Sequence, residues 1–522
     1  MTESMANEFD VVVVGSGGGA LTGAHLAAKA GLSTVVLERT ALAGGTSAYS
    51  GGACWLPGSD VQRRAGVADS TASAREYLAA ALGAIGGGPD AGRVEAFLAH
   101  APELVAALEA DPGFAFEWLP FPEYLDAPGR VPGGRSIQPV AVRRDELPPE
   151  VAALVRPPVE RDRAGRGGRG TLTGGQALVA RLLAMFLRDG GVVRTGHRVT
   201  GLLSVPQPDG RKGPQAAGRV TGVVAETASG PVEVRAARGV LLAAGGFEGN
   251  EPLRRANGVP GSAAWTMAPA GTNAGEPLEA AVAVGAATAM LGEAWFCPGL
   301  EQPGGGGSFT LGFRGGVIVD GAGRRYANEC LPYDRFGREM AKAADRIPSW
   351  LVFDAREGGR VPAIAMPEGD PEEHLAAGTW VRAETIEKLA AAMGVDAGTL
   401  AATVERYNAH AAAGADPDFG RGADEYDTFF AGGGGPSSVL VPVSEPPFVA
   451  ARVVLSDLGT KGGLVTDAAA RVLRADGTAI PGLYAVGNTS ASLTGPVYPA
   501  PGVPLGTAMV FASLAARDLA GT

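Results

Sequence analysis

The sequence predicts an α/β protein in which a Rossmann-like domain with a β-meander carries an inserted second α/β domain. Three observations indicate this fold. A β-branched run at 11–14 precedes closely spaced glycines, a helix-length segment and a second apolar run at 34–37. Short β-rich runs separated by turns occupy 192–242, and patterns of strand and helix return after residue 456. Short continuous apolar runs are typical of strands buried on both faces of a parallel sheet.

The segment 9–38 has the spacing of a dinucleotide-binding fingerprint. Gly15 allows a sharp turn, Gly17 lets backbone N–H groups approach a pyrophosphate, and Ala20 lets the following helix pack closely on the strand. Glu38, at the end of the second strand, is placed to accept hydrogen bonds from a ribose diol. The alternative is a glycine-rich turn without a ligand, but strand, glycines, helix, strand and acid all stand in register.

Paired glycines and hydroxyls follow the ribose acid at 43–47 and 49–53 and suit a loop lying along a longer dinucleotide. This arrangement resembles the flavoproteins of the fumarate reductase and ketosteroid dehydrogenase superfamily, whose cofactor is FAD. The resemblance implies a second flavin-contacting strand at 239–246 and a closing helix from 503, whose first N–H groups face the flavin. We expect non-covalent FAD, since no His or Cys has an evident linkage context. The expected FAD-binding residues are Gly15, Gly17, Gly18, Ala20, Glu38, Arg39, Gly45, Thr46, Ser47, Gly51, Gly52, Ala244, Gly245, Gly487, Asn488, Pro504 and Leu505.

Composition argues against several classes of partner. The net charge of −11 disfavours nucleic acid and anionic membrane surfaces. The three cysteines lie far apart without a CxxC pair, which favours a reducing compartment, and the five histidines lack metal-ligand spacing. No signal peptide is visible, and the longest weakly apolar stretch, 280–292, is too short to span a bilayer. We expect a cytoplasmic monomer, loosely membrane-associated at most, with no bound metal.

The composition changes near Leu291, where a mixed α/β region with scattered tryptophan and phenylalanine begins. We place the domain boundaries by this change. We expect the FAD-binding domain at 1–290 and 457–522 and the catalytic domain at 291–456. Apolar spacing predicts helices, which are expected over 20–30, 74–82, 94–109 and 176–188. Residues 156–170 are rich in Arg, Gly and Pro and also carry acids, so we expect a solvated excursion there rather than a basic binding site.

Four segments are more specific: Phe-Pro-Glu-Tyr at 121–124, the run 331–337, the run 455–463 and the run 498–509. Together they resemble the 3-ketosteroid Δ1-dehydrogenases, over nearly the whole chain. Carried over position by position, the catalytic set of that family falls on Tyr124, Tyr333, Tyr498 and Gly502. Ala500 stands where the family motif is expected to have glycine; it lies beside the site and should not remove a catalytic group.

Chemistry explains these residue types. A 3-keto group acidifies the proton on carbon 2 if its oxygen is polarised, and the resemblance assigns this oxyanion hole to the Tyr498 hydroxyl and the Gly502 N–H. Tyr333 would then take the proton, with Tyr124 sharing it, while flavin N5 accepts a hydride from carbon 1. A phenol has a reference pKa of about 10, so a base near neutrality needs hydrogen bonds or positive charge to lower it. The expected partners are a 3-ketosteroid and an electron acceptor, either a quinone or a dye in vitro.

Other functions stay open at this stage. A 3-ketosteroid Δ4-(5α)-dehydrogenase uses related parts with different regiochemistry. A fumarate-reductase-like enzyme would need Arg and His to clamp a dicarboxylate, and histidine is scarce in the insert. A non-catalytic flavin-binding protein is the alternative outside the enzymes. Most tyrosines are half-buried packing residues, and we interpret Tyr407 and Tyr426 in that way; Tyr124, Tyr333 and Tyr498 are expected on proline-bounded loops.

Overall fold

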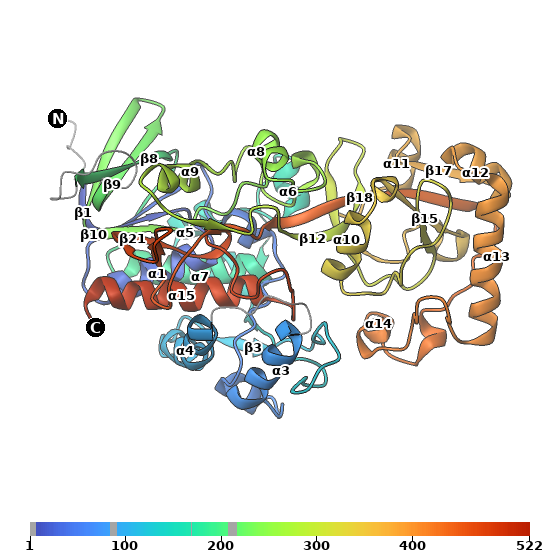
Figure 1. Cartoon of the computed structure of the whole chain (residues 1–522), viewed down its shortest axis with the longest axis horizontal. Helices are drawn as coiled ribbons and strands as arrows, with labels where there is room; N and C mark the ends of the chain where they lie inside the picture. The colour runs from blue at the N-terminus through green and yellow to red at the C-terminus, as the bar shows by residue number, and fades with distance from the viewer. Residues whose placement is uncertain (1–6, 84–90, 169, 207–216) are drawn as a thin grey trace. The chain divides into compact units, whose positions relative to one another are not determined.

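The computed structural model describes residues 7–83, 91–168, 170–206 and 217–522, which form two compact units (Figure 1). Unit 1 comprises Met1–Leu253, Ala268–Glu293 and Thr460–Thr522, and unit 2 comprises Arg254–Met267 and Ala294–Gly459. Unit 1 is therefore built from three separate stretches of chain.

The largest sheet of unit 1 has the strand order β20-β21-β10-β1-β2-β7, with β8 and β9 attached through β10. From β21 to β7 all neighbours are parallel, and β20 is an antiparallel edge strand. The bounds are β1 Glu8–Val14, β2 Thr34–Leu37, β7 Val192–Arg194, β8 Arg198–Pro206, β9 Ala217–Thr227, β10 Gly230–Leu242, β20 Arg471–Leu473 and β21 Ala479–Ala485. The predicted doubly covered parallel sheet is confirmed, and it explains why the core of β1 has no polar face.

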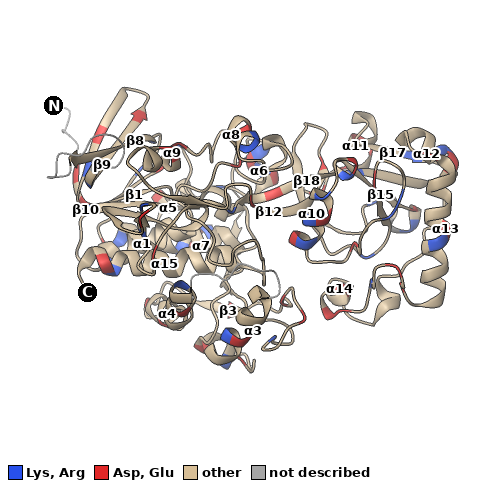
Figure 2. Ribbon diagram, viewed as in Figure 1, with Lys and Arg blue, Asp and Glu red and all other residues tan. Residues whose placement is uncertain are grey.

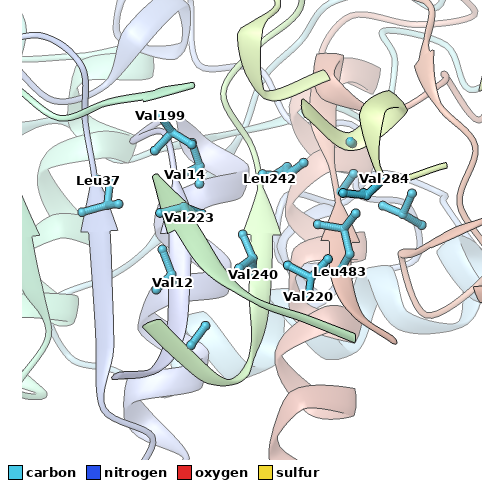
Figure 3. Packing of buried hydrophobic residues seen from close by; sticks show 14 of the residues in the cluster. Val12, Val14, Leu37, Val199, Val220, Val223, Val240, Leu242, Val284 and Leu483 are labelled. Atoms are coloured by element: carbon cyan, nitrogen blue, oxygen red, sulfur yellow. The ribbon is translucent and has the colours of Figure 1, made fainter. Parts of the chain in front are cut away.

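Alternate residues of these strands pack on opposite faces. Val12 and Val14 of β1 point, with Val240 and Leu242 of β10, toward a cluster that also contains residues of β8 and β9 (Figure 3). The other face is covered by helices α1 Gly18–Lys29, α7 Gly174–Arg188 and α15 Val503–Ala520 (Figure 1). The β-meander thus covers one face of the sheet and the helices cover the other.

The remaining elements of unit 1 are shorter. Its other helices are α2 Asp60–Arg64, α3 Thr71–Gly83, α4 Ala91–Glu109, α5 Pro149–Leu154, α6 Val159–Arg163 and α9 Glu276–Ala283, and α8 Glu251–Ala256 crosses the boundary between the units. Its two-stranded sheets pair β3 Phe116–Trp118 with β4 Ile137–Pro139, β5 Val142–Arg143 with β6 Thr171–Leu172, and β11 Thr288–Ala289 with β19 Gly463–Leu464. The four helices expected from apolar spacing are confirmed, each beginning two or three residues earlier than predicted.

One expectation is corrected. Residues 156–170 are not a solvated excursion throughout, because Arg156 is buried and its guanidinium contacts Asp162 and Thr40. Unit 2 also includes residues 254–267, which precede the expected catalytic domain in the sequence. Within unit 2 the buried Arg254 pairs with Asp457 at 2.6 Å, and a buried guanidinium of this kind is stable only beside a carboxylate.

Unit 2 has a sheet in the order β14-β15-β18-β12-β13-β16, with β17 paired to β18. Its elements are β12 Ala294–Glu301, β13 Gly307–Leu311, β14 Val317–Val319, α10 Tyr333–Ala341, β15 Ser349–Phe353, β16 Ile364–Met366, α11 Pro371–Ala377, β17 Trp380–Ala383, α12 Ile386–Met393, α13 Ala397–Ala413, α14 Glu425–Phe429 and β18 Phe448–Thr460. Acidic and basic residues are interspersed along the helices of both units (Figure 2). Helices α12 and α13 cover Val317 and Val352 of the sheet in one apolar cluster.

Helix α15 is long and apolar enough to cross a membrane by length and composition, with a mean hydropathy of 1.2, and it alone is so among the described residues. Most of it is buried, 61% in the relevant window, and it packs against α1. A core helix meets the same criteria of length and composition, and the packing of α15 is that of a core helix.

Candidate active site

The dinucleotide fingerprint forms a tight cradle between β1 and α1. Gly15 has a φ of +100°, and a Cβ there would lie 2.4 Å from the carbonyl oxygen of Ala243, so only glycine fits. Gly17 is the N-cap of α1, and the Gly18 N–H donates to Ser47 Oγ at 3.0 Å. Ala20 is buried. The N-cap Gly17 has no side chain to cap α1, and the helix start faces the 45–47 loop, an arrangement suited to binding an anion.

Glu38 follows β2 and lies at the carboxyl edge of the sheet, as predicted. Its carboxylate accepts hydrogen bonds from Ser16 Oγ at 2.5 Å and from Thr40 N at 2.8 Å. The neighbouring Arg39 pairs with Glu276 at 3.2 Å. These contacts hold the acid in place at the edge where a ribose binds in this type of fold.

The second predicted cofactor segment also lies at this edge. Thr489 Oγ1 accepts from Ala244 N at 3.0 Å and donates to the Gly245 carbonyl at 2.7 Å, which ties the 487–488 turn to the end of β10. Asn273 Nδ2 lies against Gly245 and is 3.4 Å from Thr46 Oγ1. Sequence reasoning missed Thr489 and Asn273, because neither belongs to a motif and each acts through partners distant in the chain.

The remaining predicted cofactor residues either pack closely on neighbouring segments or border open space. A Cβ on Gly18 would lie 3.1 Å from Leu505, so α15 begins beside the fingerprint, with Pro504 in its first turn. Gly45 and Gly51 border open space, whereas a Cβ on Gly52 would strike the backbone of Gly174 at 2.3 Å. The glycines, the helix start with glycine at its N-cap and the hydroxyls of this edge fit FAD, and these residues would hold its phosphates and ribose.

Two predicted catalytic tyrosines meet in unit 1. The rings of Tyr124 and Tyr498 contact edge to face, with centroids 5.2 Å apart and planes at 74°. They are 2% and 4% exposed, and the ring centroid of Phe121 lies 6.1 Å from that of Tyr124. Tyr124 lies on a loop after β3, as the flanking prolines predict.

A buried ion pair anchors the Tyr124 loop. Glu123 accepts hydrogen bonds from Arg135 Nε at 2.6 Å and from Trp55 Nε1 at 2.9 Å, and Arg135 also pairs with Asp69 at 2.9 Å. Glu123 and Arg135 are fully buried. Buried charges persist only when paired in this way, so the residue before Tyr124 is held firmly. Nothing in the local sequence pattern pairs Glu123 with Arg135.

Gly502 is the N-cap of α15, with a φ of +83°. A Cβ there would lie 2.5 Å from the backbone of Ala53, so glycine is required by packing on the chain itself as well as by any ligand. Its N–H is buried and meets no acceptor among the described residues. A buried donor without an acceptor at a helix start is the type of group that forms an oxyanion hole. Ala500, the departure from the family motif, is fully buried nearby in the same loop.

Tyr333 belongs to unit 2, where it is the first residue of α10 and 5% exposed. The prediction that it lies on a loop is wrong, because Pro332 acts as the N-cap and the helix begins at the tyrosine. The Phe309 ring packs on Tyr333 at 4.8 Å. Of the arginines near it in sequence, Arg338 pairs with Asp334 at 2.9 Å.

The segment before Tyr333 is anchored by a second buried charge cluster. Glu329 pairs with Arg325 at 2.8 Å and with Arg421 at 2.9 Å. The two arginines flank the ring of Tyr407, which confirms that Tyr407 is a packing residue. Asn328 Nδ2 donates to Asp427 at 2.9 Å.

The other reactive groups have structural surroundings. The three cysteines are free thiols, and burial raises the pKa of Cys54 and of Cys330 to about 12, so both stay protonated. Within the described ranges, His410, Asp416 and Asp418 form a cluster of possible metal ligands. Both of its carboxylates are paired with arginines, Arg325 and Arg406, which favours a structural interpretation.

A parallel sheet whose carboxyl edge carries this cradle, with an aromatic pair beside the start of a closing helix, is the architecture of a flavoprotein oxidoreductase. The family model described as "FAD binding domain" matches residues 10–505. The chain belongs to the 3-ketosteroid Δ1-dehydrogenase family of these FAD-dependent proteins.

Three relatives illustrate the similarity. A 3-oxosteroid 1-dehydrogenase of Rhodococcus opacus is 38% identical, covering 99% of this chain and 100% of the relative. A 4-oxocyclohexanecarboxylate 2-dehydrogenase of Sinomonas cyclohexanicum is 37% identical, covering 98% and 93%. The crystal structure of 3-ketosteroid Δ1-dehydrogenase from Sterolibacterium denitrificans, in complex with 1,4-androstadiene-3,17-dione, has a TM-score of 0.88 at 31% identity, covering 99% and 100%.

Proposed function

We propose that the protein is an FAD-dependent 3-ketosteroid 1-dehydrogenase. The observation that carries the proposal is the buried N–H of Gly502 in the same short loop as Tyr498, whose ring contacts Tyr124. Two neutral donors in a buried setting suit a ketone oxygen, because they stabilise the negative charge of an enolate without carrying a charge of their own.

The roles follow from this arrangement. The Tyr498 hydroxyl and the Gly502 N–H polarise the 3-keto oxygen and so acidify carbon 2. Tyr333 takes the carbon 2 proton, and Tyr124 shares it. Bound FAD supplies the acceptor for the hydride from carbon 1. The assignment of Tyr333 rests on its family motif, Leu331-Pro-Tyr-Asp334.

A second candidate is dehydrogenation of a cyclic keto acid, favoured by the similarity to the 4-oxocyclohexanecarboxylate 2-dehydrogenase. The chemistry is the same, since a ketone acidifies its neighbouring carbon in both substrates. A 3-ketosteroid differs in size and lacks the carboxylate, so direct comparison of the two substrates separates the candidates.

The test uses purified holoenzyme, a dye acceptor and a saturated 5α-3-ketosteroid, which offers both a carbon 1–2 and a carbon 4–5 bond. We expect a double bond at carbon 1–2, identified by mass spectrometry and NMR. Exclusive carbon 4–5 product would assign the Δ4-(5α) activity instead, and turnover of 4-oxocyclohexanecarboxylate alone would assign the second candidate. Flavin that neither ketone bleaches would favour a non-catalytic flavin-binding protein.

The natural acceptor, a monomeric state and a cytoplasmic location stay predictions from the sequence.

A further inference from the structure

The loop that carries Tyr498 and Gly502 has few donors of its own. Pro499 and Pro501 lack N–H groups, so fewer amides are available to hold this stretch than in an ordinary turn. Its carbonyl oxygens are the other backbone groups that can fix its position. The donors to these carbonyls therefore contribute to the placement of the two polarising groups.

Each of four carbonyls in this loop has a donor from elsewhere in unit 1. Val497 O accepts from Lys461 Nζ at 2.7 Å, and Pro501 O accepts from Ser136 Oγ at 2.7 Å. Gly502 O accepts from Trp55 N at 3.0 Å. Pro499 O accepts twice, from the Tyr77 hydroxyl at 2.6 Å and from the Tyr124 amide at 2.9 Å.

Besides the Tyr124 amide, which joins the two tyrosine loops directly, the Tyr77 side chain contacts both of them. Its hydroxyl donates to Pro499 O, next to Tyr498, and accepts from Leu125 N, next to Tyr124, at 3.2 Å. The side chain is fully buried on α3, and the Arg135 guanidinium lies over its ring at 5.7 Å. One hydroxyl thus joins two segments that lie far apart in the sequence.

We propose that Tyr77 is a positioning residue for ketone dehydrogenation: its hydroxyl sets the placement of Tyr124 against the oxyanion hole of Tyr498 and Gly502. The inference rests on the proposed function of that site. Both hydrogen-bonding capacities of the hydroxyl that the structure shows are used on backbone groups, so Tyr77 acts through its neighbours and not on substrate. Burial also raises the pKa of this phenol, with a further contribution from Glu123, so the hydroxyl stays a donor at every working pH.

The test compares Tyr77→Phe with Tyr484→Phe in the holoenzyme. Tyr484 is a matched control, since its hydroxyl also makes a 2.6 Å hydrogen bond in unit 1, but to Asp518. We expect Tyr77→Phe to lower kcat about tenfold or more with KM changed less than about threefold, because misplaced polarising donors weaken transition-state binding selectively. Tyr484→Phe should leave both constants near wild type, and FAD content should be unchanged in both variants.

A double-mutant cycle separates positioning from a loss of fold. In a Tyr498→Phe background the Tyr77 hydroxyl no longer has a polarising phenol to place, so adding Tyr77→Phe should cost much less than it does in wild type. Full additivity, a near-normal kcat in Tyr77→Phe, or an equal loss in Tyr484→Phe would each overturn the inference. Measurements with both the steroid and 4-oxocyclohexanecarboxylate keep the two proposals apart. Wild type that oxidises neither ketone defeats the proposed function and this inference together, whereas active wild type with an unaffected variant defeats the inference alone.

Discussion

Ser136 donates its hydroxyl hydrogen to the carbonyl oxygen of Pro501 at 2.7 Å; both residues are buried, and Pro501 immediately precedes the oxyanion-hole glycine Gly502. Ser136→Ala should therefore lower kcat about threefold to tenfold, since loss of a buried neutral hydrogen bond leaves the Pro501 carbonyl unsatisfied and loosens the loop. Steady-state kinetics with a 3-ketosteroid measure this. The control is Ser438→Ala, which removes a hydroxyl hydrogen-bonded to a glycine carbonyl at an exposed turn of unit 2. This substitution should leave kcat unchanged.

Tyr498→Phe keeps the ring that packs on Tyr124 and removes only the hydroxyl. Turnover should fall about a hundredfold or more, because one oxyanion donor is lost, while the FAD absorbance per protein is unchanged. Near-normal turnover would show that this hydroxyl does not hold the ketone.

Tyr333→Phe should abolish exchange of the carbon 2 proton with deuterated water as well as turnover. Enolisation needs the polarising donors and the base but no electron acceptor, so wild-type enzyme already reduced with dithionite should still exchange. Mass spectrometry measures deuterium incorporation in wild type, Tyr333→Phe and Tyr124→Phe, and the last should only be slowed. Undiminished exchange in Tyr333→Phe would move the base role to Tyr124.

Arg135→Met leaves Glu123 as an unpaired buried carboxylate and should destabilise the protein by about 3–5 kcal/mol. Thermal or urea unfolding measures this loss. The control is Arg75→Met, which breaks the solvent-exposed pair with Glu95 and should change the stability little. Equal effects of the two substitutions would contradict the anchoring role of the buried pair.

The FAD should be released by acid. No covalent attachment is expected, so trichloroacetic acid precipitation should leave the yellow colour in the supernatant, measured by its absorbance spectrum. Colour that stays with the precipitated protein would show a covalent link.

Stability should fall as the pH drops through the mid-sixes. His25 is fully buried on α1 beside Asp189, and its pKa is lowered, chiefly by burial. In the unfolded chain this histidine binds a proton near its ordinary pKa of about 6.5, whereas in the folded chain it stays neutral at that pH. Stability is therefore lost below that pH and retained above it. His25→Gln should flatten the dependence of the unfolding free energy on pH between about 7 and 5.5, measured by urea titration, although His374, whose pKa is also lowered by burial, leaves part of the slope.

The parts of this molecule that follow from local pattern were predictable. Val11–Val14, the glycines after it and Glu38 specify their own conformation through the periodicity of a buried strand and the steric freedom of glycine, so the cradle could be derived from the sequence. Pro120 and Pro122 likewise exclude a helix before Tyr124. The loop predicted at Tyr333 is wrong because proline occurs at the start of a helix as well as in loops. At a helix start the missing N–H removes no hydrogen bond.

The supports of the site could not be derived in this way. Tyr77, Ser136 and Thr489 are ordinary residues in their own segments, and each matters only through a backbone group that the fold brings to it from elsewhere in the chain. The same holds for Arg156, which the local composition places in solvent and which the structure buries beside Asp162. A single sequence carries no signal for such pairings.

The arrangement of unit 1 has a consequence for synthesis of the protein. Strand β10 pairs with β1 on one side and with β21 on the other, and α15 covers the same sheet, so the unit needs the last stretch of the chain. Residues 294–459, by contrast, leave the ribosome earlier and contain the whole sheet of unit 2. Since domains generally fold as units during translation, unit 2 can reach its native state while the dinucleotide-binding strands still wait for β21. During that interval the edge of β10 that pairs with β21 and the surfaces of β10 and α1 that pack against α15 are uncovered, so we expect a nascent chain stalled before residue 479 to bind chaperones.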